Sequence, residues 1–166
     1  HYSEYYYKDG DYKFVNHDSY FQDDLFKSKE QRNYLVISNS DTVFCLNAKV
    51  SDADVVEYKV KQAADTILNQ SCDLISITLK PAGKEGPLSF RRYYFSRKLP
   101  VNPVHFSGCK ANAYDLIYEN AKALPLRIEF EWPNRVIRWE AYEISRQPLS
   151  TDIFRKQDNW ICKNIN

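Results

Sequence analysis

Alternating apolar and polar residues give the clearest structural signal in the chain. From Leu126 to Trp132 every second residue is apolar, and the three residues between are charged, which is typical of a strand with one buried face. A Pro-Asn turn follows, and a return strand is predicted over about 135–145 with a bulge near Ala141, where the apolar phase changes. These residues predict an antiparallel hairpin.

Two more hairpins are predicted earlier in the chain. The first joins strands at 34–37 and 42–46 across a polar turn. The second joins strands at 74–79 and 90–97. Their connection, at 81–87, is rich in glycine and proline, which disfavour regular structure.

Helical spacing of apolar residues predicts helices around these hairpins. One helix is expected over about 52–69, with Ser51 placed to cap its first turn. A second is expected over about 111–124, and Pro125 ends it. A third is predicted to begin near Ser150. The fold class predicted is therefore α+β: an antiparallel sheet of hairpins with two to three amphipathic helices packed on one face, braced by disulfides.

Composition fits one globular domain. The chain has 166 residues, of which 43% are hydrophobic and 27% are charged, and its formal net charge is +1. These values exclude disordered and low-complexity chains, and the length suits one domain. We predict a single domain over 1–166, made of an acidic, tyrosine-rich segment at 1–31 and an α+β core at 32–166. No apolar stretch has the length of a membrane-spanning helix.

The cysteines and the start of the chain bear on its compartment. The chain begins at His1 and contains no Met, so the initiator was removed by signal-peptide cleavage, by excision from a larger protein or by design. Four cysteines without a C-x-x-C pair favour two disulfides over a zinc site. We expect an extracytoplasmic protein, secreted or periplasmic. The predicted helix between them favours Cys45–Cys72, leaving Cys109–Cys162; buried thiols in a cytosolic chain are the alternative.

Residues suited to catalysis are few. The only histidines are His1, His17 and His105. His105 precedes Cys109 by four residues, so a Cys–His hydrolytic pair requires Cys109 to stay reduced. No cofactor is expected because the glycine motifs that cradle phosphates are absent, and no metal because His17-Asp18 lacks the regular spacing of a hard-cation site. This balance favours a binding protein over an enzyme.

A basic, aromatic stretch is the candidate binding surface. Seven cations lie between positions 80 and 110, against one acid, Glu85. The predicted binding residues are Arg91, Arg92, Tyr93, Tyr94, Arg97 and Lys98. Cations interleaved with aromatic rings suit an acidic protein surface or an anionic glycan, whereas a net charge of +1 argues against nucleic acid. The alternative is a solvated strand with a mixed face, because neighbouring residues of a strand point to opposite faces.

Aromatic content also favours recognition of another macromolecule. The chain has 13 Tyr and 3 Trp, and tyrosine is enriched at protein contacts. We predict an extracytoplasmic protein-binding module, such as an inhibitor, an immunity protein or a receptor- or adhesin-associated domain. The alternatives are a secreted hydrolase or toxin domain using His17 or His105, and a structural domain excised from a larger surface or secretion protein. Asn69 begins a glycosylation sequon, which matters only in a eukaryotic secretory pathway.

Overall fold

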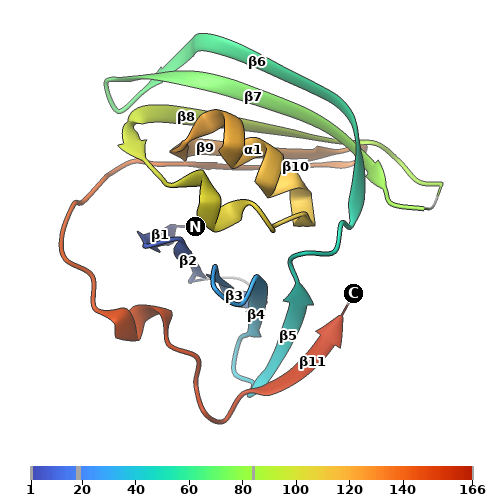
Figure 1. The fold of residues 1–166 in the computed structure, drawn as a ribbon, viewed down its shortest axis with the longest axis vertical. Helices are drawn as coiled ribbons and strands as arrows, with labels where there is room; N and C mark the ends of the chain where they lie inside the picture. Colours follow the sequence, from blue (N-terminus) through green and yellow to red (C-terminus); the bar gives the residue numbers. More distant parts are fainter. Residues whose placement is uncertain (1, 18–19, 84, 166) are drawn as a thin grey trace. The chain divides into compact units, whose positions relative to one another are not determined.

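The computed structural model describes residues 2–17, 20–83 and 85–165 of the chain. His1 and Asp18, which entered the sequence analysis, lie outside these residues. The described residues are mostly β-strand and form two sheets (Figure 1).

The chain divides into two compact units. The first combines the two ends of the chain, His1–Val50 and Gln147–Asn166, and the second is Ser51–Arg146. The prediction of a single domain stays a prediction, and each unit is described by itself below.

The first unit is a six-stranded sheet in the order β1-β2-β3-β4-β5-β11. Its strands are β1 (Ser3–Lys8), β2 (Asp11–Asn16), β3 (Phe21–Lys27), β4 (Arg32–Ile37), β5 (Thr42–Asn47) and β11 (Ile161–Ile165). The first five are antiparallel neighbours, whereas β11 pairs in parallel with β5. The tyrosine-rich segment predicted at 1–31 therefore supplies three strands, and the hairpin predicted at 34–37 and 42–46 is confirmed as β4–β5.

One face of this sheet packs against the chain that leads to β11. Leu25, Val43 and their neighbours form a hydrophobic cluster with Phe154, which is buried. Phe154 ends a single 3-10 turn, η3 (Thr151–Phe154). The hydroxyl of Ser150 caps that turn by accepting a hydrogen bond from the Asp152 amide at 3.2 Å. The helix predicted to begin near Ser150 is thus only this turn.

The second unit is a five-stranded antiparallel sheet in the order β10-β9-β8-β7-β6. Its strands are β6 (Ala53–Ile67), β7 (Gln70–Pro81), β8 (Ser89–Pro100), β9 (Ala123–Trp132) and β10 (Arg135–Glu140). Between β8 and β9 the chain forms η1 (Pro103–Phe106), η2 (Ala111–Ala113) and α1 (Tyr114–Ala121). The hairpins predicted at 74–79/90–97 and at 126–132/135–145 are present as β7–β8 and β9–β10, although β10 ends at Glu140.

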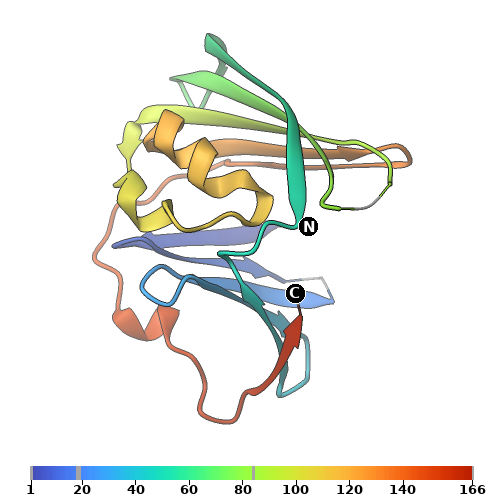
Figure 2. The ribbon, with the colours of Figure 1, turned by 45° about the vertical axis from the view of Figure 1, so that its right-hand side comes forward.

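The helix α1 covers one face of this sheet, which we call the helix face (Figure 2). Phe95 on β8 meets the ring of Tyr118 edge to face, and Tyr93 meets Tyr114 in the same way. The helix predicted over about 111–124 is found as the 3-10 turn η2 at 111–113 followed by α1 at 114–121. It ends because Lys122 adopts a left-handed conformation, with φ 50°, and donates its amide hydrogen bond to the Tyr118 carbonyl at 3.0 Å.

The α+β prediction with two to three helices is wrong, because the described residues contain one α-helix and two large sheets. The error lies mainly at 52–69, which was predicted as a helix and is the long strand β6. Two bulges, between Val55 and Glu57 and between Lys61 and Asp65, shift the alternation of β6. Each shift changes the phase of the apolar residues, so that their spacing imitates a helical period.

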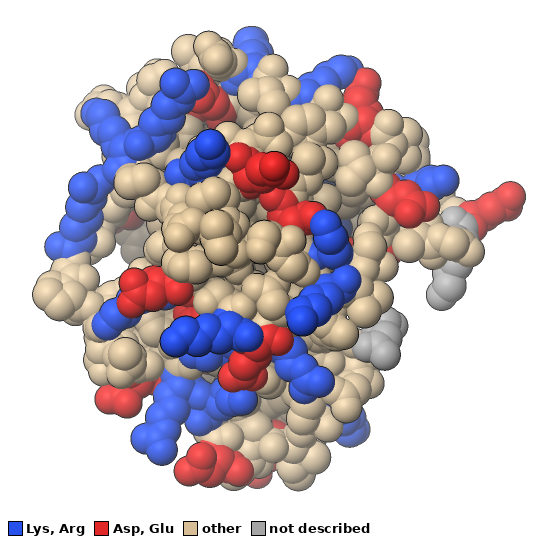
Figure 3. Space-filling view, in the orientation of Figure 1, with Lys and Arg blue, Asp and Glu red and all other residues tan. Residues whose placement is uncertain are grey.

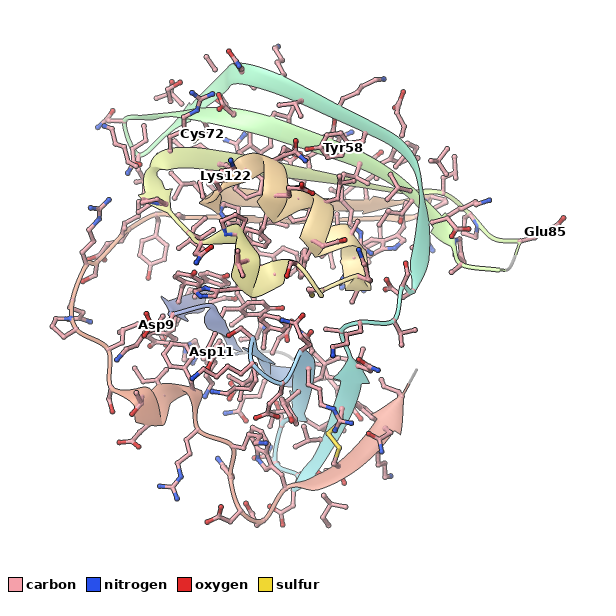
Figure 4. All side chains as sticks on the ribbon, viewed as in Figure 1. Asp9, Asp11, Tyr58, Cys72, Glu85 and Lys122 are labelled. Carbon is pink, nitrogen blue, oxygen red and sulfur yellow. A yellow bond between two sulfur atoms is a disulfide. The ribbon has the colours of Figure 1, made fainter. Side chains whose placement is uncertain are left out.

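The predicted disulfide pairing is also wrong. The structure joins Cys45 on β5 to Cys162 on β11, with 5.7 Å between the two Cα atoms, and the bond is visible in yellow in Figure 4. These cysteines lie on neighbouring strands, whereas Cys72 and Cys109 are buried and remain thiols. The helix that favoured the Cys45–Cys72 pairing is absent. One disulfide remains, and such bonds are typical of chains that fold in an oxidising compartment.

In the view of Figure 3, acidic and basic side chains are interspersed over most of the surface, and basic side chains predominate at its upper left. Within the described ranges, no helix combines the length and the apolar composition that crossing a membrane requires.

Candidate functional site

The predicted basic site is divided between the two faces of β8. On the helix face, Tyr93 is buried in the core. Arg91, also on this face, hydrogen bonds to Asn112, and its guanidinium lies 4.7 Å from the centre of the Phe130 ring. These contacts place Arg91 in the packing of the second unit rather than in an open patch.

The other predicted binding residues are matched by acids or lie apart from them. On the opposite face, Arg92 Nη1 lies 3.0 Å from Glu131 Oε2 and 3.6 Å from Glu129 Oε2. The ring of Tyr94 lies beneath the guanidinium of Arg127. Arg97 Nη2 is 2.7 Å from Asp73 Oδ2, and Lys98 is exposed. The six predicted residues therefore do not come together as one basic surface.

The candidate catalytic residues occupy unrelated places. His17 Nε2 lies 3.0 Å from Glu4 Oε2 on the exposed surface, and its ring stacks on Tyr2. His105 is part of η1, and Cys109 has no exposed surface, so a substrate does not reach that thiol in this structure. In the part of the chain that the structure describes, no three His, Cys, Asp or Glu side chains lie close enough to hold a metal ion.

The outer edge of β6 is a long, exposed edge of the second unit. This fifteen-residue strand is the last in its sheet and pairs with β7 on one side. The outer side of such an edge presents backbone N–H and C=O groups to another chain. Val55, Val56 and Val60 are 41%, 53% and 54% exposed. Sequence reasoning missed this edge because it assigned these residues to a helix, although a run of β-branched residues favours a strand.

The bulges determine how much of the β6 edge is regular. Between them, Glu57 to Lys61 pairs continuously with Thr78 to Leu74 of β7. At the second bulge, the Ala63 amide leaves the ladder and donates to Asp73 Oδ1 at 2.9 Å. Bulges and charged side chains protect sheet edges from unspecific pairing. The open stretch therefore suits an added strand of about five residues.

A hollow of about 400 Å³ opens beside this stretch on the helix face. It is lined by Val60, Gln62, Asp73, Ile75, Phe95, Arg97, Asn120, Ala121 and Lys122. Ile75 and Phe95 are buried and form an apolar floor, to which Val60 adds its exposed side chain. Ligand pockets commonly combine such an apolar floor with a few polar groups.

The rim of the hollow carries positive charge, and a half-buried tyrosine lies on the same face of β6. The charge of Arg97 is compensated by Asp73, whereas Lys122 is exposed just beyond the end of α1. Tyr58, two residues before Val60, points to the same face of β6 (Figure 4). Its hydroxyl oxygen is buried without a hydrogen-bond partner among the described residues. Burial, together with nearby Glu119, raises the pKa of this hydroxyl, which therefore stays protonated at neutral pH.

Comparisons with protein-family models, with curated proteins and with solved structures give no match for this chain.

Proposed function

We propose that the protein is an extracytoplasmic protein-binding module that takes up an extended segment of its partner along the outer edge of β6. The observation that carries the proposal is an open edge strand with half-exposed valines beside a hollow with an apolar floor. Strand addition obtains affinity from backbone hydrogen bonds and specificity from alternate side chains. The extracytoplasmic part of the proposal is supported by the Cys45–Cys162 disulfide.

The hollow favours a particular partner sequence. Every second side chain of an added strand points to the helix face, so one of them enters the hollow over Ile75 and Phe95. Burial of a large aliphatic or aromatic side chain there removes apolar surface from water on both sides. Lys122 favours an acidic group next to it. The partner segment thus combines an apolar residue with an acidic one two positions away.

Selection from a random seven-residue peptide library tests this proposal. Peptides that bind the full chain are expected to share the apolar and acidic pair. The substitution Val60→Glu places a carboxylate at the hollow and should weaken their binding by about tenfold or more, because the apolar contact is worth over 1 kcal/mol. Val136→Glu is the matched control, since Val136 is 65% exposed on β10, the opposite edge of the same sheet.

Hydrogen exchange gives a second measurement on the same complex. Bound peptide should slow exchange of backbone amides between Glu57 and Lys61, where β6 is regular. The proposal fails if no peptide is enriched, if Val60→Glu and Val136→Glu weaken binding equally, or if protection appears only on other strands.

A further inference from the structure

The first unit contains a separate hollow of about 360 Å³ that shares no residue with the β6 site. It lies beside β3 and β4 and the segment that precedes β11. Its lining residues are Gln22, Asp23, Val36, Ile37, Asn39, Ser40, Asp41, Gln157 and Trp160. Most of them are polar, in contrast to the apolar floor of the β6 hollow, so this hollow suits a ligand that carries many hydrogen-bonding groups.

Asp23 has a buried oxygen that nothing in the described structure satisfies. The residue is only 8% exposed, and its Oδ2 lies 2.8 Å from Lys13 Nζ. Its Oδ1 is buried and has no hydrogen-bond partner among the described residues. A buried acceptor without a donor costs about 1–3 kcal/mol, so such groups call for a specific explanation. A ligand that donates a hydrogen bond in the hollow supplies the missing partner.

The charges around Asp23 indicate what kind of donor fits. Lys13 already compensates the negative charge of Asp23, so Oδ1 acts as an acceptor in a locally neutral pair. Asp41 is exposed and accepts a hydrogen bond from the Asn159 side chain, which is neutral and leaves the charge of Asp41 in place. At Asp23 Oδ1 itself, a neutral hydroxyl group suits better than a cation, which would meet the Lys13 ammonium.

The walls of the hollow are held in place by backbone contacts. The Asp41 carbonyl accepts from the Ile161 amide at 2.8 Å, which ties the β4–β5 turn to the start of β11. Ser40 Oγ accepts from the Thr42 amide at 3.0 Å, so its hydroxyl hydrogen is directed elsewhere. The Trp160 amide donates to the Gln157 carbonyl at 3.2 Å. The polar side chains thus project from fixed turns.

Trp160 supplies the one aromatic ring of the lining. Part of its indole packs on the hydrophobic cluster of the first unit, with its ring 6.0 Å from that of Tyr34, and part lines the hollow. The face of an indole ring is electron-rich and attracts the weakly positive C–H groups of a saturated ring. A sugar ring presents such C–H groups on its faces and hydroxyls around its edge.

We propose that this hollow binds a neutral sugar unit. Asp23 Oδ1 accepts a hydrogen bond from one of its hydroxyls, and the side-chain amides of Asn39 and Gln157 bond others. Trp160 contacts the face of the sugar ring. This hollow and the β6 edge belong to different units and recognise different chemistry, so either assignment stands or fails without the other.

Binding of the methyl glycosides of glucose, galactose, mannose and N-acetylglucosamine tests the proposal. Saturation-transfer NMR and tryptophan fluorescence on the full chain should detect binding of at least one of them. Gln157→Ala removes an exposed side-chain amide. Loss of the one hydrogen bond that this amide gives the sugar should weaken binding about fivefold. Asp158→Ala changes the neighbouring, almost fully exposed residue and should leave affinity unchanged.

Two further comparisons make the outcome decisive. Asp23→Asn keeps the size of the side chain but removes its charge, and it should weaken sugar binding about tenfold while the Val60→Glu variant binds sugar normally. Methylammonium and butylammonium serve as cationic probes. The proposal is overturned if no glycoside binds, if the ammonium ions bind in their place, or if Gln157→Ala and Asp158→Ala behave alike.

Discussion

Arg127 and Asp65 form an ion pair, although two other strands of the sheet lie between the strand of Arg127 and the strand of Asp65. Arg127 is on β9 and Asp65 is on β6, and Arg127 Nη1 lies 2.6 Å from Asp65 Oδ2. The bulge after Lys61 redirects the end of β6, so that Asp65 reaches a guanidinium that lies 4.6 Å from the centre of the Tyr94 ring. Glu140 on β10 contacts the same guanidinium. The Arg127 side chain on β9 thus contacts residues of three other strands, β6, β8 and β10.

Replacing this cation should destabilise the second unit. Arg127→Met removes both ion pairs and the contact with Tyr94, and we expect the free energy of unfolding to fall by about 1–2 kcal/mol, because Asp65 and Glu140 are partly exposed. Urea unfolding measures the change. Arg135→Met, at an exposed position on β10, should change stability by less than about 0.5 kcal/mol. Equal effects of the two variants would contradict the linking role.

Asp24 on β3 should make the protein less stable as the pH rises. Burial raises the pKa of this carboxyl from 3.8 to about 6, although Asn33 Nδ2 donates to its Oδ1 at 3.0 Å. The unfolded chain therefore releases this proton near pH 4 and the folded chain near pH 6. Stability is lost between these two values and stays lost above them.

Asp24→Asn removes the free-energy cost of ionising this buried carboxyl. Its side-chain carbonyl still accepts a hydrogen bond from Asn33. We expect the variant to be more stable than the parent at pH 8, by on the order of 2 kcal/mol, and close to it at pH 3, where both side chains are neutral. Chemical denaturation at the two pH values measures the difference. Asp158→Asn, on an almost fully exposed carboxyl, should change stability little at either pH. A gain at pH 3 equal to that at pH 8 would show that ionisation of Asp24 is not the cause.

The four cysteines should differ in their reactivity toward a thiol reagent. A thiol reagent should titrate two thiols in the unreduced, denatured protein and neither of them rapidly in the native one, because Cys72 and Cys109 are buried. Two outcomes contradict the pairing: four thiols, or none.

Removing the single crosslink should release the end of the chain. Cys45→Ser with Cys162→Ser frees β11 from its covalent tie to β5, which we expect to cost about 2–4 kcal/mol. Trypsin should then cut faster after Lys156, as followed by mass spectrometry. Cys72→Ala is the control and should leave this cleavage rate unchanged.

Local patterns predicted the hairpins because each pairs neighbours in sequence. The alternation from Leu126 to Trp132 and its return strand needed no distant contact. The structure confirms the first strand and the return strand as far as Glu140, where the strand ends without the predicted bulge near Ala141. The helix near 114–121 could also be predicted, since Leu116, Ile117 and neighbouring apolar residues have helical spacing, although it ends at Lys122 and not at the residue before Pro125. In these regions a single turn, or the spacing of apolar residues within a single element, is enough to predict the structure.

Non-local pairings could not be read in the same way. The strand β11 lies beside β5, and its parallel partner comes more than 110 residues earlier in the chain, so no short window shows the pairing. The Cys45–Cys162 disulfide depends on this pairing and was missed with it. The two candidate hollows could not be predicted for the same reason, because each is lined by residues that are far apart in the sequence. Asp23 and Trp160, for example, line the same hollow.

The basic stretch illustrates a different difficulty. Its composition was correctly noted, but composition does not reveal that Arg92 lies beside Glu131, which is 39 residues away. The acids that neutralise the stretch come from β7 and β9 rather than from β8 itself. A local excess of charge in the sequence thus did not become one basic surface, because acids pair with Arg92 and Arg97 while Arg91 packs against Phe130.

The insertion of the second unit between β5 and β11 sets an order of events during synthesis. Ser51–Arg146 contains consecutive strands and can fold as soon as it emerges, whereas the first sheet is complete only once its last strand has emerged. Cys45 can meet its partner only after Cys162 has been made, 117 residues later. An insert that folds first would bury Cys72 and Cys109 before that point and keep them from pairing with Cys45. The order of synthesis would then favour the bond that the structure contains.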